Sequence, residues 1–153
     1  MREKWKRIIL CLAVPLGVGG LAALLSGDFG RVYDTVVRPP LSPPGWLFPV
    51  VWTALYALMG WASFLVLDSP GEKGRALILY GVQLLINFLW PIVFFGLGSV
   101  GWALALLLAL WLLVFWTIRE FSEVSEKAGD LLIPYILWLS FALYLNFGIF
   151  ILN

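Results

Sequence analysis

The fold is decided by apolar stretches such as residues 100–119, which read VGWALALLLALWLLVFWTIR and carry no charge before Arg119. A helix of about 20 mostly apolar residues is long enough to cross the hydrocarbon core of a bilayer. We therefore predict an all-α polytopic membrane protein, a single domain over residues 1–153 built as a bundle of five transmembrane helices. The predicted spans are residues 7–26, 47–67, 76–95, 100–119 and 131–152.

The composition supports a lipid bilayer as the solvent of this chain. It is 62% hydrophobic and 12% charged, with a mean hydropathy of +0.97, whereas soluble domains are about 45–50% apolar and about 25% charged. The charged start and the apolar run from Ile8 resemble a signal peptide, but the run continues to about Leu25 without a clean cleavage site. We expect a retained first helix, with a cleaved signal as the less favoured alternative.

Several classes of function are disfavoured by what the chain lacks. A net charge of +1 offers no clustered basic surface, so we expect no nucleic-acid partner. The chain has one cysteine and no histidine, which leaves neither a thiolate cage nor the commonest metal ligand and general base. We predict no metal site and no required cofactor.

Basic residues are distributed unevenly between the two sides of the predicted bundle. One side has only Arg31 and Arg38, and because cytoplasmic loops are enriched in Lys and Arg, we expect the N-terminus in the cytoplasm and the C-terminus outside. The N-terminus and the second and fourth connections share the other side, with Arg2, Lys4, Lys6, Arg7, Lys73, Arg75, Arg119 and Lys127.

The first connection, residues 27–46, is longer than the others and is expected to face outward. At about 20 residues it exceeds the length of about 12–15 beyond which loops are usually functional or disordered. It carries Tyr33, Arg38, four prolines and Trp46, so it is too stiff for a random tether. A lid over a pocket and a passive linker are both open interpretations.

Polar side chains within spans are costly in lipid and normally face the bundle interior. In three of the predicted spans, polar and aromatic residues recur every three or four positions and so form a stripe along one face of the helix. These three stripes lie at similar depths, in the outer half of the predicted membrane. Two interpretations stay open: an outward-opening pocket for a planar apolar ligand, or amides that join helices by hydrogen bonds. The stripes are Trp52 and Tyr56, then Gln83, Asn87 and Trp90, then Tyr135, Trp138, Ala142 and Asn146.

The first span contains a run of small residues, Gly17-Val18-Gly19-Gly20. We interpret it as a place of close helix packing. Small residues four apart, such as Gly19 and Ala23, could serve either packing within the bundle or the face of a dimer.

Three motifs together resemble the translocator protein family, also known as the TspO, tryptophan-rich sensory protein or peripheral benzodiazepine receptor group. They are RPPLSPPGW with PVVWTALYALMG in residues 38–60, QLLINFLWP in residues 83–91, and PYILWLSFA with Asn146 in the fifth span. The resemblance covers nearly the whole chain, in order.

The resemblance implies a five-helix bundle, often a homodimer, in what would here be a bacterial cell membrane. It implies binding of tetrapyrroles such as protoporphyrin IX, and of benzodiazepine-type and isoquinoline ligands, in a pocket capped by the first loop. Some bacterial members promote light-dependent breakdown of protoporphyrin IX, and tryptophans matching Trp52 and Trp138 are implicated as redox partners. The pocket positions of the family match Tyr33, Trp46, Trp52, Asn87, Trp90, Trp138 and Ala142.

We therefore expect a protein that binds protoporphyrin IX and promotes its degradation in light. Whether this is enzymatic stays open, because a bound porphyrin could simply photo-oxidise nearby tryptophans. A transporter or sensor of hydrophobic ligands is the alternative, although no charge within a span offers ion coupling. The candidate ligand-binding residues are Tyr33, Trp46, Trp52, Tyr56, Gln83, Asn87, Trp90, Trp138, Ala142 and Asn146.

Overall fold

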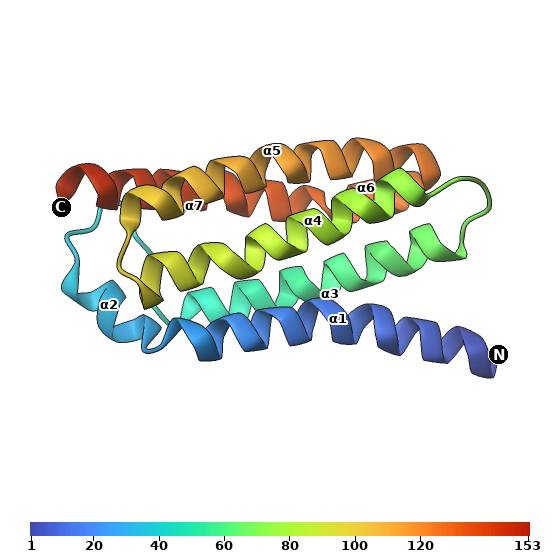
Figure 1. Ribbon diagram of the computed structural model, residues 1–153, viewed down its shortest axis with the longest axis horizontal. Coiled ribbons are helices and arrows are strands. Elements are labelled where there is room, and N and C mark those ends of the chain that lie inside the picture. Colours follow the sequence, from blue (N-terminus) through green and yellow to red (C-terminus); the bar gives the residue numbers. More distant parts are fainter.

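The computed structural model describes residues 1–153, and every regular element in it is helical (Figure 1). The predicted all-α bundle of five long apolar helices is confirmed. A short helix, α2 (Phe29–Thr35), lies in the first connection. The five long helices are α1 (Arg2–Ser26), α3 (Leu47–Asp68), α4 (Gly74–Pro91) continued by the π-helix η1 (Ile92–Gly96), α5 (Val100–Val124), and α6 (Glu126–Leu131) continued by α7 (Ile133–Leu152).

The two termini lie at opposite ends of the bundle, as an odd number of spans requires (Figure 1). One end carries the N-terminus, the α3–α4 turn and the α5–α6 junction, and we call it the N-terminal end. The other end carries α2, the turn after η1 and the C-terminus, and we call it the lid end. The connections rich in Lys and Arg therefore share the N-terminal end, while the side of the membrane that it faces stays a prediction.

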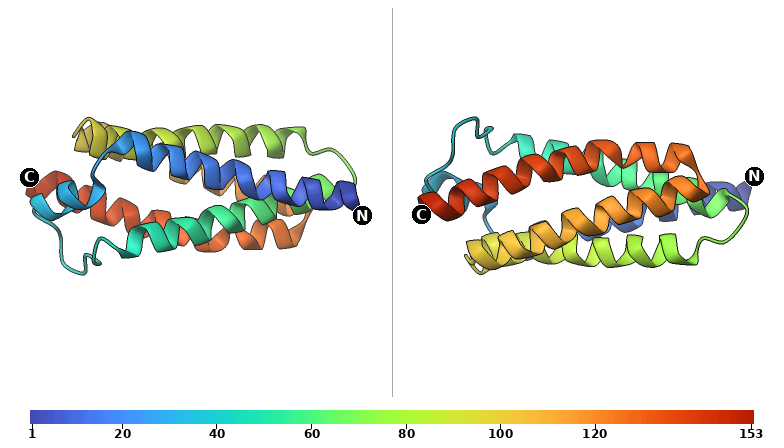
Figure 2. Two further views of the ribbon diagram at one scale, coloured as in Figure 1. Left: turned by 90° about the horizontal axis from the view of Figure 1, so that it is seen from below. Right: turned by 90° about the horizontal axis from the view of Figure 1, so that it is seen from above.

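The helices form a ring in which each packs on its neighbours. α1 contacts α3 and α4, α4 contacts α5, α5 contacts α7, and α6 contacts α3 (Figure 2). α5 supplies fully buried side chains at Ala103, Leu107, Leu110 and Val114. Their spacing of three or four residues forms one helical stripe that faces the bundle core.

A close approach of α1 and α3 depends on two glycines. A Cβ atom on Gly60 would lie 2.6 Å from the carbonyl oxygen of Cys11, and a Cβ atom on Gly19 would overlap the ring of Tyr56. Gly19 thus serves helix packing, as its small-residue run suggested. Gly17 and Gly20 have no neighbour within 4 Å of where a Cβ atom would lie, and a homodimer stays a prediction.

The end of α4 departs from a regular α-helix. Pro91 has no N–H to donate, and the chain continues as the π-helix η1, in which the N–H of Leu97 bonds the carbonyl of Ile92 at 2.9 Å. Gly98, at φ +66°, then makes the tight turn into α5. Single π-helical turns occur often at functional sites, and this one brings Phe94 and Phe95 to the cavity described next.

A candidate ligand cavity beneath the lid

A cavity of about 400 Å³ lies at the lid end of the bundle, between α1, α3, η1 and α7, with α2 across it. Ligand sites commonly have volumes of about 300–1,000 Å³. No Asp, Glu, Lys or Arg is among the residues that line it. The cavity therefore suits a largely apolar molecule.

Eight of the 22 residues that line the cavity are aromatic. Trp52 lies at the centre of the cluster, with its ring centroid 5.6 Å from that of Tyr56 and 6.2 Å from that of Trp90. These distances fall in the range of favourable ring–ring contacts, so a planar ligand could join the cluster by stacking. The aromatic lining residues are Phe29, Tyr33, Phe48, Trp52, Tyr56, Trp90, Phe94 and Phe95.

Asn146 is the amide of this wall, and its polar atoms are buried without a partner. Its residue is 3% exposed, and neither its amide nitrogen nor its amide oxygen makes a hydrogen bond. Buried polar atoms are nearly always paired, because leaving one unpaired costs free energy. An amide with a free donor and a free acceptor at a cavity is therefore suited to bind a polar group of a ligand.

The other predicted amides are paired with protein groups. Tyr56 Oη donates to Asn87 Oδ1 at 2.6 Å, and Asn87 Nδ2 donates to Tyr135 Oη at 2.6 Å. Tyr135 Oη in turn donates to Gln83 Oε1 at 2.8 Å. This chain of bonds joins α3, α4 and α7, so Gln83 and Asn87 hold helices together and fix Tyr56, and their side chains do not line the cavity.

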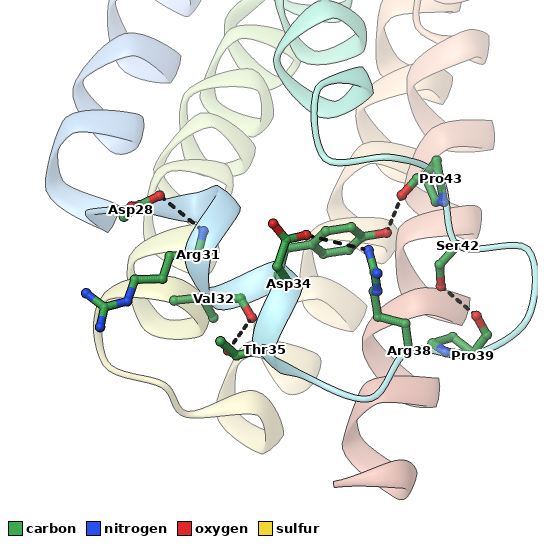
Figure 3. A network of polar contacts seen from close by, with 10 residues as sticks. Asp28, Arg31, Val32, Asp34, Thr35, Arg38, Pro39, Ser42 and Pro43 are labelled. Carbon is green, nitrogen blue, oxygen red and sulfur yellow. Dashed lines mark hydrogen bonds and ion pairs between the residues drawn. The ribbon is translucent and has the colours of Figure 1, made fainter.

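The first connection covers the cavity. Phe29 and Tyr33 of α2 line it, and Tyr33 Oη donates a 2.6 Å hydrogen bond to the carbonyl of Pro43. The Arg38 guanidinium lies 4.5 Å from the Tyr33 ring centroid and 3.9 Å from the carboxylate of Asp34 (Figure 3). Since these contacts join the two ends of the connection, it is an ordered cover, which we call the lid.

The lid is fastened to the last turns of α7. Asn153 accepts a hydrogen bond from the Val37 N–H at 3.1 Å and donates one to the Val37 carbonyl at 2.9 Å. Tyr144 Oη donates to the carbonyl of Pro40 at 2.6 Å. Gly148 lies so close to Pro39 that a Cβ atom there would be 2.5 Å from its ring. Opening the lid must break these contacts together.

The structure brings six of the predicted ligand-binding residues onto the cavity wall and leaves four off it. Besides Gln83 and Asn87, Trp46 is 67% exposed at the start of α3. Trp138 packs behind Phe48, at 5.7 Å between ring centroids, and its Nε1 is buried without a partner. The residues on the wall are Tyr33, Trp52, Tyr56, Trp90, Ala142 and Asn146.

The contribution of α1 to the wall was not predicted. Gly19, Ala23 and Ser26 lie along one side of α1 at spacings of four and three residues, and all three line the cavity. That spacing was the available signal, but small residues were interpreted only as a packing or dimer surface. Phe48 of α3 and Phe94 and Phe95 of η1 were also missed.

Comparison with known proteins gives a consistent result over the full length. The sequence matches the TspO/MBR family over residues 8–152. It is 37% identical to the tryptophan-rich protein TspO of Chlorobaculum tepidum, over 100% of this chain and 99% of that protein. It is 38% identical to the tryptophan-rich sensory protein of Cereibacter sphaeroides, covering 100% and 95% of the two chains. The translocator protein of Ovis aries is 34% identical, covering 96% and 90%.

Proposed function

Because this chain belongs to the TspO/MBR family, an integral membrane protein family, we propose that its cavity beneath the lid binds a metal-free tetrapyrrole of the protoporphyrin IX type. The observation that carries the proposal is an aromatic cavity with a single unpartnered amide, that of Asn146. Stacked rings would hold the macrocycle, and the amide would bond a nitrogen or oxygen of the ligand.

A metal-free porphyrin is preferred over haem because the wall offers no strong iron ligand. The chain has no histidine. Cys11 and Met59 are buried elsewhere and do not line the cavity. Haem iron in proteins takes an axial His, Cys, Met or Tyr, and of these only Tyr33 and Tyr56 line the wall, both already donating hydrogen bonds. Matched titrations in the dark should give tighter binding of protoporphyrin IX than of haem.

We further propose that the bound porphyrin is degraded in light with Trp52 as its electron donor. The excited porphyrin would take one electron from the indole, leaving a tryptophan radical cation and a porphyrin radical anion, with dioxygen as the oxidant for the later breakdown. Trp52 is on the cavity wall, whereas the ring of Phe48 packs against Trp138, which does not line the cavity. Trp52 is thus the better placed of the two tryptophans.

The same apolar, aromatic wall would accept benzodiazepine-type and isoquinoline ligands. These are flat aromatic molecules with one or two polar groups, so they would use the same rings and the same amide. We expect them to compete with protoporphyrin IX for one site, with displacement following simple one-site competition.

The light reaction is tested by following protoporphyrin IX absorbance on purified protein, in light and in the dark. We expect loss of the porphyrin spectrum only in light, several-fold slower with Trp52→Phe and less affected by Trp138→Phe. If Trp52→Phe degrades bound porphyrin at the wild-type rate, Trp52 is not the electron donor. Intact porphyrin together with oxidised tryptophans in the wild type would instead show a photosensitised side reaction.

Reconstitution in liposomes distinguishes transport of porphyrin from binding and degradation. Porphyrin supplied outside should bind without accumulating in the lumen in the dark, because no charged side chain lies within the bundle to couple an ion gradient. Accumulation in the lumen above the level of protein-free liposomes would favour the transporter interpretation.

A further inference from the structure

A second cavity lies near the N-terminal end, on the side of the bundle formed by α1, α3 and α4. Its volume is about 230 Å³. It is lined by the N-terminal half of α1, the C-terminal half of α3 and the N-terminal half of α4, whereas the first cavity is lined by the other halves of these helices. The close approach of Gly60 to Cys11 lies at the border of this second cavity. We call it the α1–α4 crevice, and its lining includes Cys11, Val14, Ser63, Leu67, Leu77 and Tyr80.

Tyr80 gives the crevice an unpartnered polar group. The residue is 8% exposed, its ring packs against Phe121 at 5.7 Å between centroids, and its hydroxyl makes no hydrogen bond. Ser63 is the other hydroxyl of the lining, and it donates to the carbonyl of Gly60 within its own helix at 2.8 Å. The Tyr80 hydroxyl lies beside Ser63 but outside hydrogen-bonding geometry, so it can donate to an acceptor brought in by a ligand.

The crevice is open toward the surface that faces lipid. Leu10 and Val14 of α1 are 63% and 51% exposed, and both line it. Its volume lies below the range of about 300–1,000 Å³ that is common for pockets that bind drug-sized ligands. A narrow hydrocarbon chain suits it better than a flat macrocycle.

Two basic side chains stand at the rim of the crevice. Arg7 precedes Leu10, Cys11 and Val14 by three, four and seven residues, so it lies one turn beyond them on the same face of α1. Lys73, in the α3–α4 turn, donates to the carbonyls of Leu67 at 2.8 Å and Ser69 at 2.6 Å.

Neither rim cation is neutralised by an ion pair. Lys6 pairs with Glu3 and Arg75 with Glu120, but no carboxylate lies within 4 Å of Arg7 or Lys73. Asp68 and Glu72 are the acidic side chains of the same turn, and neither forms a salt bridge. A phosphate could therefore approach both cations.

We propose that the α1–α4 crevice is a binding site for an anionic phospholipid of the bilayer. The acyl chain lies in the crevice, the ester carbonyl accepts a hydrogen bond from Tyr80, and the charged head group lies between Arg7 and Lys73. Tyr80 follows Lys73 by seven residues, or about 10 Å along the helix axis, so it lies deeper in the membrane than the rim cations. This depth suits the ester region of the lipid. This site is independent of the tetrapyrrole cavity.

Native mass spectrometry of the purified full chain tests the proposal. The protein is mixed with equal amounts of phosphatidylglycerol and phosphatidylcholine in detergent, and retained lipid is counted. We expect one retained phosphatidylglycerol in preference to phosphatidylcholine. Arg7→Gln should reduce this preference about five-fold, the factor that corresponds to the roughly 1 kcal/mol contributed by one basic residue near an anionic lipid.

Two further variants separate a built site from general charge attraction. Tyr80→Phe keeps the ring against Phe121 and should lower retention of the lipid. Lys127→Gln removes the same charge from α6, which does not border the crevice, and should leave retention unchanged. Equal retention of the two lipids by the wild type, or an equal effect of Arg7→Gln and Lys127→Gln, would overturn the proposal.

Discussion

The hydroxyl of Tyr56 lies 2.6 Å from Asn87 Oδ1, so a residue of the cavity wall is held in place by a residue that is not part of the wall. Asn87 is fully buried, and its amide nitrogen also donates to Tyr135. One side chain of α4 therefore orients a tyrosine of α3 and binds a tyrosine of α7. The two asparagines predicted to bind ligand, Asn87 and Asn146, therefore differ in their surroundings: the first amide is paired within the protein and the second is not.

Asn87→Leu should destabilise the protein. The substitution keeps the volume but leaves the Tyr56 hydroxyl buried without an acceptor, at a cost of about 1–3 kcal/mol. Thermal unfolding in detergent, followed by circular dichroism, should show a lower midpoint than the wild type. Thr53→Ala is the control and should change the midpoint little, because the exposed Thr53 hydroxyl bonds only the carbonyl of Pro49 in its own helix.

Asn146→Leu should have the opposite profile. The wild-type amide makes no hydrogen bond, so its replacement should leave the unfolding midpoint unchanged or raise it. Dark binding of protoporphyrin IX should weaken about ten-fold, equivalent to the roughly 1.4 kcal/mol of one good hydrogen bond. Unchanged binding together with a lower midpoint would assign Asn146 to the fold instead of the ligand.

Gly19→Ala and Gly20→Ala, neighbours in one helix, should shift stability in opposite directions. Alanine favours a helix over glycine by about 0.5–1 kcal/mol at either position. At Gly19 the new Cβ atom overlaps the Tyr56 ring, and overpacking of this kind costs about 1–3 kcal/mol. At Gly20 it meets nothing within 4 Å. Equal shifts in the unfolding midpoints of the two variants would show that Gly19 of α1 does not pack closely against Tyr56.

Asn153→Ala should speed ligand release. The substitution removes both hydrogen bonds that tie Val37 of the lid to α7, each worth about 0.5–1.5 kcal/mol. Stopped-flow displacement of protoporphyrin IX should give a dissociation rate several-fold above the wild type. Thr35→Ala removes only a bond within α2, to Val32, and should keep the wild-type rate. Equal rates for all three proteins would exclude the lid as the barrier to release.

Much of this architecture could be predicted because a bilayer imposes simple rules on sequence. Length and hydropathy define five spans, and helical spacing places Trp52 with Tyr56 on one face of α3. The same spacing cannot say which partner a polar group meets across the bundle. Asn87 and Asn146 look alike in sequence, and only their neighbours distinguish a paired amide from a free one.

The role of α1 and of η1 could not be predicted for a related reason. From Ile8 onward α1 is apolar on all sides, so its sequence does not show which face meets the cavity, and Gly19 is compatible with contact to any neighbour. The π-helix arises where Pro91 interrupts the regular bonding, but a proline near a helix end more often marks only the end. Trp138 lies on the predicted stripe of α7, but the ring of Phe48 packs against it. Phe48 lines the cavity and Trp138 does not, and helical spacing alone could not show this contact.

The most direct test of the tetrapyrrole site is a dark absorbance titration of protoporphyrin IX against Ala142→Trp. Ala142 is buried on the cavity wall, so the indole would fill space that the ligand needs. Leu137→Trp places the same residue on α7 at a position that is 65% exposed, away from the cavity. We predict an affinity at least ten-fold weaker for Ala142→Trp and unchanged for Leu137→Trp. Wild-type affinity in Ala142→Trp would show that the porphyrin binds elsewhere on the protein.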